Sequence, residues 1–228
     1  MTTLVIRLAG PLQSWGAASR FSRRETLQHP TKSGVVGLLA AAQGRRRTDP
    51  IEDLASLSFG VRIDQPGRLT RDFQVAVRLT DGKSMPISER YYLADAVFVA
   101  AVQGDPELID GLANALRRPT FPLYLGRRSC PPSRPMYLHV CDLPVESALD
   151  ATEWQAAPWY QRKQARQVRL RTILDAGADA GDQLRDQPVS FNPERRDYSW
   201  RSVREGFVTI NNPQGLELHD PMAALGGS

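Results

Sequence analysis

The sequence contains few of the residues that build metal centres, disulfide frameworks or membrane spans. Its 228 residues include two cysteines and three histidines. Cys130 and Cys141 have no second pair, so neither a zinc site nor a disulfide framework is indicated. No apolar run approaches the roughly 20 residues of a membrane span, and Arg7 interrupts the one N-terminal segment that could be a signal peptide. We therefore expect a cytoplasmic protein with reduced cysteines, no metal, no other cofactor and no membrane contact.

Lysine is scarce as well, with only Lys32, Lys83 and Lys163 among 29 basic residues. The formal net charge is +4, but residues 1–48 hold eight basic side chains and one acidic one, a local charge of +7 that leaves −3 for the rest. Clustered arginine suits a polyanionic partner, because the planar guanidinium binds phosphate and stacks on bases. A GC-rich genome would also raise the proportion of arginine, but it does not explain the clustering.

The apolar pattern predicts an α+β fold. Alternation predicts a strand over 2–10, and helical spacing predicts a helix that follows Thr31 and ends at Gly44. Asp105 and Pro106 mark the start of a second helix. Further strands are predicted at 56–64, 73–79, 91–102 and 134–143, and the polar segment 78–90 is expected to project as a hairpin. The order β-α-β-β-α-β is that of the ferredoxin-like unit.

Two regions are expected along the chain. Residues 1–143 form the ferredoxin-like domain, and residues 144–228 form a small β-rich accessory region. In the second region "QVRLRTILDAG" and "REGFVTINN" predict strands, and the tail "MAALGGS" is expected to be flexible.

The stretch "HPTKSGVVGLLAAAQG" places hydroxyls, a lysine and a glycine at the start of the first predicted helix. A basic helix start opposes the helix dipole unless an anion is bound there. Backbone N–H groups could then hold a phosphate together with Thr31, Lys32, Ser33 and Gly34. The alternative is that Thr31 or Ser33 only caps the helix while Lys32 extends into water. The upstream glycines of a nucleotide-binding P-loop are absent, so nucleotide hydrolysis is not indicated.

A second loop, "PLYLGRRSCPPSRP", offers backbone N–H groups, guanidinium groups and a hydroxyl to a nucleic-acid backbone, from Gly126, Arg127, Arg128 and Ser129. The segment after the first strand could present an amide, a hydroxyl and a stacking ring to splayed bases, from Gln13, Ser14 and Trp15. Trp15 is equally well explained as a core residue.

Four segments occur together in the order of a known family: "RLAGPLQSWG", "HPTKSGVVGLLAAAQG", "RYYLADAVF" and "PLYLGRRSCPPS". In this combination the chain resembles the CRISPR-associated RAMP superfamily, and most closely the CasD-like subunits of type I-E Cascade. The resemblance covers residues 4–130, and the segment from about 144 to 190 offers little to compare.

The resemblance implies a modified RRM core with a protruding thumb near residues 71–90. Such subunits cap the 5′ handle of the crRNA and contact the backbone subunit and the large subunit, so that they meet target DNA only indirectly. Arg20, Arg23 and Arg24 would then contact RNA or a neighbouring subunit, and Arg90, at the base of the thumb, would contact RNA. The resemblance implies no catalytic residue, because in type I-E systems a separate subunit cuts the precursor RNA.

Two alternatives remain open. Equivalent proteins of type I-C systems process the precursor, so a metal-independent endoribonuclease is one of them, with His29 as the single candidate acid or base near a basic loop. General acid–base cleavage needs a second positioned group, and the sequence does not indicate one. The other alternative is an RRM-like protein–protein adaptor without affinity for RNA.

Overall fold

The computed structural model describes residues 1–16, 23–177 and 180–216. Within these residues, seven antiparallel strands form one sheet in the order β10-β11-β9-β4-β7-β1-β8. The strands are β1 (Thr2–Ala9), β4 (Ser58–Gln65), β7 (Val97–Gly104), β8 (Tyr137–Cys141), β9 (Gln167–Asp175), β10 (Asp182–Ser190) and β11 (Asp197–Asn211). The expected α+β class is confirmed.

Two helices pack on one face of this sheet. Helix α1 (Lys32–Ala42) and helix α3 (Pro106–Arg117) share a core with the inward side chains of β1, such as Leu4 and Ile6. Asp105 caps α3 as predicted, because its Oδ1 accepts hydrogen bonds from two backbone N–H groups of the first turn. Alternate residues of β1 and β7 face the other side, where helix α4 (Val145–Ala151) covers them. The predicted order β1-α1-β4-β7-α3-β8 is therefore present.

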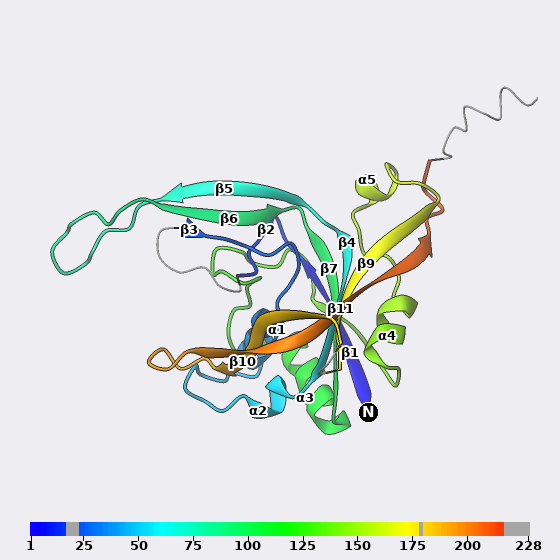
Figure 1. The fold of residues 1–228 in the computed structure, drawn as a ribbon, viewed down its shortest axis with the longest axis horizontal. Helices are drawn as coiled ribbons and strands as arrows, with labels where there is room; N and C mark the ends of the chain where they lie inside the picture. Colours follow the sequence, from blue (N-terminus) through cyan, green and yellow to red (C-terminus); the bar gives the residue numbers. More distant parts are fainter. Residues whose placement is uncertain (17–22, 178–179, 217–228) are drawn as a thin grey trace, which may run out of the picture.

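A hairpin of strands β5 (Arg68–Gln74) and β6 (Ser88–Ala94) projects from this body as the predicted thumb (Figure 1). It begins slightly earlier and ends slightly later than the expected 71–90. The single strand predicted over 91–102 is wrong, because the chain turns at Asp95, which has a φ of 58°. β6 pairs with β5, β2 (Leu12–Gln13) and β3 (Arg23–Arg24) in a second sheet, whereas β7 pairs with β1 and β4.

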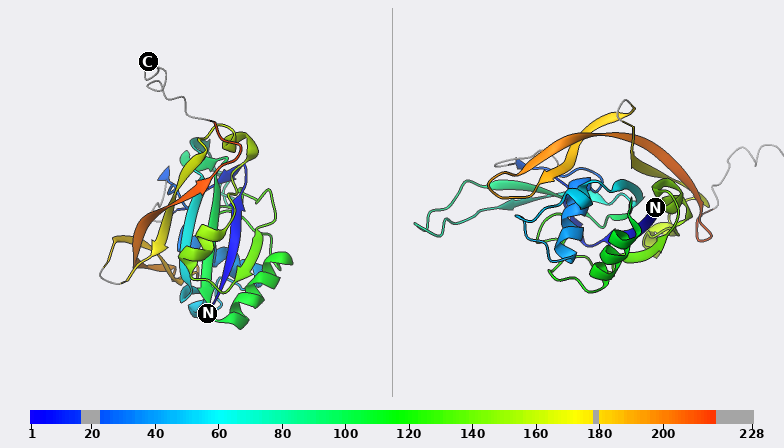
Figure 2. Two further views of the ribbon diagram at one scale, coloured as in Figure 1. Left: turned by 90° about the vertical axis from the view of Figure 1, so that its right-hand side faces the viewer. Right: turned by 90° about the horizontal axis from the view of Figure 1, so that it is seen from below.

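The predicted β-rich C-terminal region is present, but its strands do not form a separate unit. β9 pairs with β4, so that β9, β11 and β10 extend the N-terminal sheet across the expected boundary near residue 143. The β10–β11 hairpin extends in the same direction as the thumb in Figure 1, and Figure 2 shows the pair curving over the body. The expected flexible tail lies outside the described residues.

Two short helices complete the described chain: α2 (Glu52–Ala55) and α5 (Pro158–Gln161). None of the helices in the described ranges is long and apolar enough to cross a membrane.

Candidate nucleic-acid interface

The start of α1 is closed by the chain itself. Thr31 is the N-cap, and its Oγ1 accepts a hydrogen bond from the Gly34 N–H at 3.2 Å. The neighbouring N–H of Lys32 donates to Oδ2 of Asp186, a residue of β10, at 2.8 Å. The anion that the basic helix start requires is therefore an internal carboxylate, 154 positions away in the sequence.

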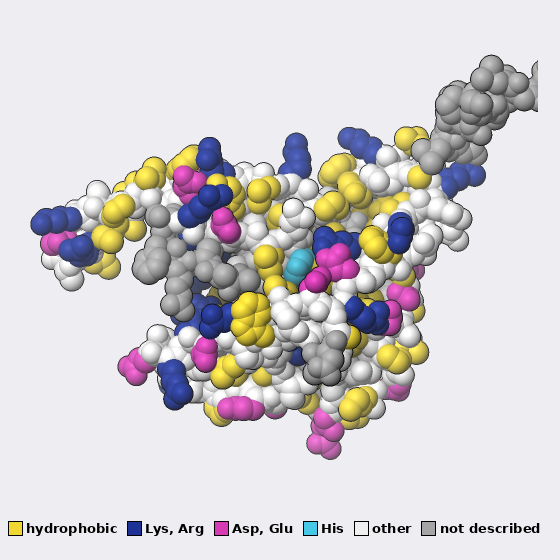
Figure 3. Space-filling view, in the orientation of Figure 1, with side chains coloured by type: hydrophobic (Ala, Val, Ile, Leu, Met, Phe, Trp, Pro, Cys, Tyr) yellow, Lys and Arg dark blue, Asp and Glu magenta, His cyan; other side chains and the backbone are white. Residues whose placement is uncertain are grey.

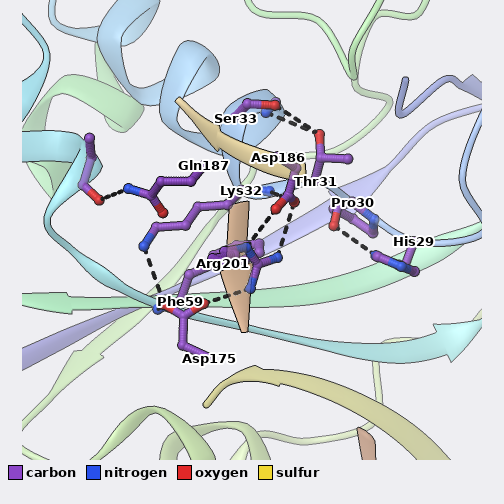
Figure 4. A network of polar contacts seen from close by, with 12 residues as sticks. His29, Pro30, Thr31, Lys32, Ser33, Phe59, Asp175, Asp186, Gln187 and Arg201 are labelled. Carbon is purple, nitrogen blue, oxygen red and sulfur yellow. Dashed lines mark hydrogen bonds and ion pairs between the residues drawn. The ribbon is translucent and has the colours of Figure 1, made fainter. Parts of the chain in front are cut away.

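Lys32 belongs to a buried network with Asp175, Asp186 and Arg201, which we call the helix-start network (Figure 4). The Lys32 ammonium lies 3.2 Å from Oδ2 of Asp175, and its residue is only 5% exposed. Arg201 donates to Asp186 at 2.6 and 3.0 Å and to Asp175 at 2.6 Å. Burial lowers the pKa of Lys32, and the ion pair with Asp175 opposes that shift.

The expected phosphate site at this helix start is thus corrected. Lys32 is neither extended into water nor available to a phosphate, because two carboxylates balance the two cations of the network. Ser33 is buried, and its hydroxyl lies 3.4 Å from Oγ1 of Thr31. Gly34 is required for packing, since a Cβ at this position would come within 2.8 Å of the Trp15 ring.

Residues 13–15 are also structural. Trp15 is 1% exposed and lies in the core, as the alternative interpretation of this residue held. The Gln13 amide is buried and donates to the carbonyls of Leu8 and Ala96, while its oxygen accepts from Nε1 of Trp15. The buried Ser14 donates from Oγ to the carbonyl of Tyr91 at 3.2 Å. The expectation that these three side chains meet splayed bases is wrong for the described conformation, because their polar atoms already have internal partners.

The other predicted residues meet at the base of the thumb. Arg24 on β3 lies opposite Arg90 on β6, because the two short strands pair in parallel. Arg127 donates from Nη2 to the carbonyl of Arg24 at 2.8 Å, and its guanidinium lies 4.7 Å from the centroid of the Tyr92 ring. Arg128 follows on the exposed side of the same loop. We call Arg24, Arg90, Arg127 and Arg128 the thumb-base surface.

The loop that holds Arg127 is shaped by a glycine. Gly126 has a φ of 86°, and a Cβ there would lie 1.7 Å from the carbonyl oxygen of Ser14. The loop can approach the 13–15 segment this closely only without a side chain at that position. Ser129 is exposed beside Arg128, and its hydroxyl lies 3.9 Å from the sulfur of Cys130.

The thumb-base surface brings four cations together, and Asp72 lies opposite Arg90 on the neighbouring strand. Among the described residues, Nη1 of Arg127 has no hydrogen-bond partner, although the atom is buried. Arg23 neighbours Arg24, stacks on Tyr91 at 5.3 Å and forms an exposed ion pair with Glu25. Figure 3 shows Lys and Arg side chains on the thumb, interspersed with acidic and apolar ones. Arg20 lies outside the described residues.

The sequence pattern does not indicate the three residues that form the helix-start network with Lys32. Asp175, Asp186 and Arg201 lie far from α1 in the sequence, and the apolar alternation of their strands does not indicate which polar residues face inward. Tyr92 could have been found, since the "RYYLADAVF" segment places it directly after Arg90 and Tyr91.

Metal and acid–base chemistry have little support in this region. The described part of the chain contains no group of three or more His, Cys, Asp or Glu side chains able to hold a metal ion. His29 is half-buried, and its Nδ1 lies 3.0 Å from the carbonyl of Pro30. Burial lowers the pKa of His29. Cys130 and Cys141 are free thiols.

The fold and the arginine-rich thumb base agree with the family comparison. The model of the family described as "CRISPR-associated protein (Cas_Cas5)" matches residues 3–204. The chain belongs to this family, which confirms the resemblance found in the sequence.

One relative and two solved structures are similar to this chain in sequence. The chain is 35% identical to the CRISPR system Cascade subunit CasD of Escherichia coli (strain K12) over 158 residues, which cover 60% of this chain and 70% of the relative. A solved structure described as a CRISPR RNA-guided surveillance complex contains a chain with 33% identity and a TM-score of 0.76, covering 93% of this chain and 92% of that one. A crystal structure described as a Cas protein gives 40% identity and a TM-score of 0.72, covering 94% and 98%.

Proposed function

We propose that this chain is a non-catalytic subunit of a Cascade-type, CRISPR RNA-guided surveillance complex, in which it binds and caps the 5′ handle of the crRNA. Membership of the family and the likeness to the Cascade subunit CasD support this proposal. An RRM-like core is part of it, supported by the strand order β4-β7-β1-β8 with α1 and α3 on one face.

The observation that carries the proposal is the thumb-base surface. Three separate segments, β3, β6 and the loop after Gly126, place Arg24, Arg90 and Arg127 together at the base of the projecting hairpin. Arginine forks grip phosphate oxygens through charge-assisted hydrogen bonds. A bent single strand of RNA at the base of the thumb would contact these side chains. Lys32 and residues 13–15 would instead stabilise the loop and the β-strands that carry the arginines.

The thumb itself supports contacts with neighbouring subunits. It exposes large apolar side chains on β5 and along the connection from β5 to β6: Leu69, Phe73, Val75, Val77, Leu79, Met85 and Ile87. Leu79 is fully exposed. A contiguous apolar surface of this kind marks an interaction site in a folded protein. We assign it to the backbone and large subunits of the complex, which leaves contact with target DNA indirect.

The test compares two double variants that remove equal charge. Arg24→Ala with Arg90→Ala removes two guanidinium groups from the thumb-base surface, and Arg46→Ala with Arg47→Ala removes two exposed ones beyond the end of α1. In a titration of labelled handle RNA, the first pair is expected to weaken binding by at least about tenfold. It should also lower the salt slope of log K by roughly one to two. The second pair should change affinity less than about twofold, and equal losses would contradict the proposal.

The absence of cleavage is tested separately. A single-turnover reaction of the full chain with labelled repeat RNA, with EDTA present, is expected to leave the RNA intact. Accumulation of a discrete product that disappears with His29→Ala would establish the endoribonuclease alternative instead.

A further inference from the structure

A second basic surface lies apart from the thumb base. Residues 161–171 read QRKQARQVRLR, with five cations and no carboxylate, and they connect α5 to β9. α5 lies beyond the root of the thumb, on the side away from the hairpin tip (Figure 1). The handle site proposed above uses none of these residues.

A cavity of about 370 Å³ opens beside this stretch. The turn between β4 and β5 and the turn between β6 and β7 form one wall, with Arg68 and Asp95. Trp159 on α5 and Lys163, which follows this helix, form the other wall. The Gln65 amide fixes the two walls, because its Nε2 donates to the Asp95 carbonyl at 2.5 Å and its Oε1 accepts from the Ala157 N–H at 3.1 Å. We call this cavity the Trp159 pocket.

The pocket combines an open aromatic ring with positive charge. Trp159 is 47% exposed, although its ring packs against the edge of Tyr160 at 5.8 Å. The Lys163 ammonium lies 5.4 Å from the Trp159 ring. Two cations, Arg68 and Lys163, and one carboxylate, Asp95, line the pocket. A ring held in place but left half exposed is a surface on which a planar group can stack.

Strands β9 and β11 also place an exposed aromatic ring beside a cation. Phe207 on β11 is 54% exposed, and the Arg169 guanidinium on β9 stacks 3.9 Å from the centroid of its ring. Arg171 pairs with Glu205 on the same strands, so its charge is compensated. Arg169 and Phe207 therefore form a second pair of a cation and an exposed ring, and Arg169 lies on the strand that follows Lys163 in the chain.

We propose that the Trp159 pocket and the outer end of β9 bind a segment of single-stranded nucleic acid other than the 5′ handle. One base stacks on Trp159, and the flanking phosphates contact Lys163, Arg68 and Arg169. Stacking platforms beside a basic track are the general means by which proteins hold single strands. A protein ligand fits less well, because it would have to present acidic groups to Arg68, Lys163 and Arg169, whereas a single strand carries a phosphate on every nucleotide.

The test uses the full chain carrying Arg24→Ala and Arg90→Ala, so that the contribution of the thumb base is reduced. Binding of fluorescent 12-nucleotide oligo(dT) and oligo(rU) is measured by anisotropy. Adding Trp159→Ala is expected to weaken binding by about tenfold, which corresponds to the loss of one stacked base. Trp200→Ala is the matched control, because Trp200 is also exposed, at 62%, but lies on β11 away from the pocket. It should change binding less than twofold.

Two further variants complete the experiment. Trp159→Phe should retain most of the affinity, since it keeps a stacking ring. Arg68→Ala with Lys163→Ala should reduce the dependence of binding on salt. The oligo(dT) and oligo(rU) titrations show whether DNA or RNA is preferred.

Equal effects of Trp159→Ala and Trp200→Ala, or the absence of salt-dependent oligonucleotide binding, would overturn the proposal and leave a protein-docking surface. Neither result affects handle binding, which is measured with the thumb base intact.

Discussion

The start of α1 and the base of the thumb are both rich in positive charge, yet they differ in what balances it. In the helix-start network, Lys32 and Arg201 face Asp175 and Asp186 in the interior. At the thumb base, Arg24 and Arg90 lie beside each other on paired strands at the surface. The first arrangement stabilises the fold, whereas the second leaves its charge available to a ligand.

The comparison shows that a basic helix start is not sufficient to predict an anion site. The "PTKSG" segment satisfies the local requirements, but strands 143 and 154 positions further along supply the carboxylates. A buried cation keeps a carboxylate partner because an unpaired charge in the interior is costly. A surface cation has no such requirement and can exchange water for phosphate.

The start of α1 and the base of the thumb should differ most in how strongly their charged residues affect the free energy of unfolding. Asp186→Ala leaves Arg201 and the α1 start without their buried carboxylate, and it is expected to lower the free energy of unfolding by about 3–5 kcal/mol. Urea denaturation measures this change. Asp186→Asn, which retains hydrogen-bonding capacity, should be the milder variant.

Glu146→Ala is the matched control for that prediction. It removes a carboxylate that pairs with Arg204 at the surface, and exposed pairs contribute less than about 1 kcal/mol. If Asp186→Ala proved as mild as Glu146→Ala, the helix-start network would not be the stabilising element described above.

A smaller change in the free energy of unfolding is expected when the pH is lowered. Burial lowers the pKa of His29, and the positive charges of Arg171 and Arg201 act in the same direction, while Asp186 and the Pro30 carbonyl oppose the shift. Between the lowered pKa and 6.5 the unfolded chain binds more protons than the folded one. Stability therefore rises with pH through this window and is lost as pH falls below 6.5, by at most about 1.4 kcal/mol per pH unit.

Unfolding by urea between pH 7.5 and 5.5 measures this dependence. His29→Gln should make the loss of stability on acidification smaller, and His139→Gln serves as the control. An unchanged pH dependence in His29→Gln would show that another group is responsible.

The smallest change in stability is expected for Lys32, a residue of the phosphate site that the sequence predicted. Lys32→Met leaves two carboxylates facing one guanidinium, but Asp175 keeps Arg201 and its side chain is 27% exposed to water, so we expect a loss of stability of only about 1 kcal/mol. Handle affinity should stay within about twofold, measured by the same RNA titration as for the thumb-base variants. A tenfold loss with unchanged stability would return Lys32 to the RNA site.

Much of the fold could be predicted because its signals are local. The alternation of β1, the Asp105 cap of α3 and the hairpin between β5 and β6 depend on residues close together in the chain. The prediction of one strand over 91–102 is wrong for a physical reason: two strands that belong to different sheets are joined by a two-residue turn, Asp95 and Ala96, and their combined periodicity resembles that of one strand.

The arrangement of the candidate site depends on tertiary contacts. Arg24, Arg90, Arg127 and Arg128 come together because β3 pairs with β6 and the loop after Gly126 packs on residues 13–15, contacts that no local pattern in the sequence indicates. Gln13, Trp15 and Lys32 have the right chemistry for RNA, but their burial depends on packing that no local pattern records.

The sequence by itself determined the order of the core elements, the projecting hairpin and the family, because each follows from residue spacing along the chain. Only the tertiary structure decided which cations are neutralised inside and which remain at the surface. That decision depends on the distance between charges in space, and antiparallel pairing brings Asp175 and Asp186 to the start of α1 from the far end of the sequence.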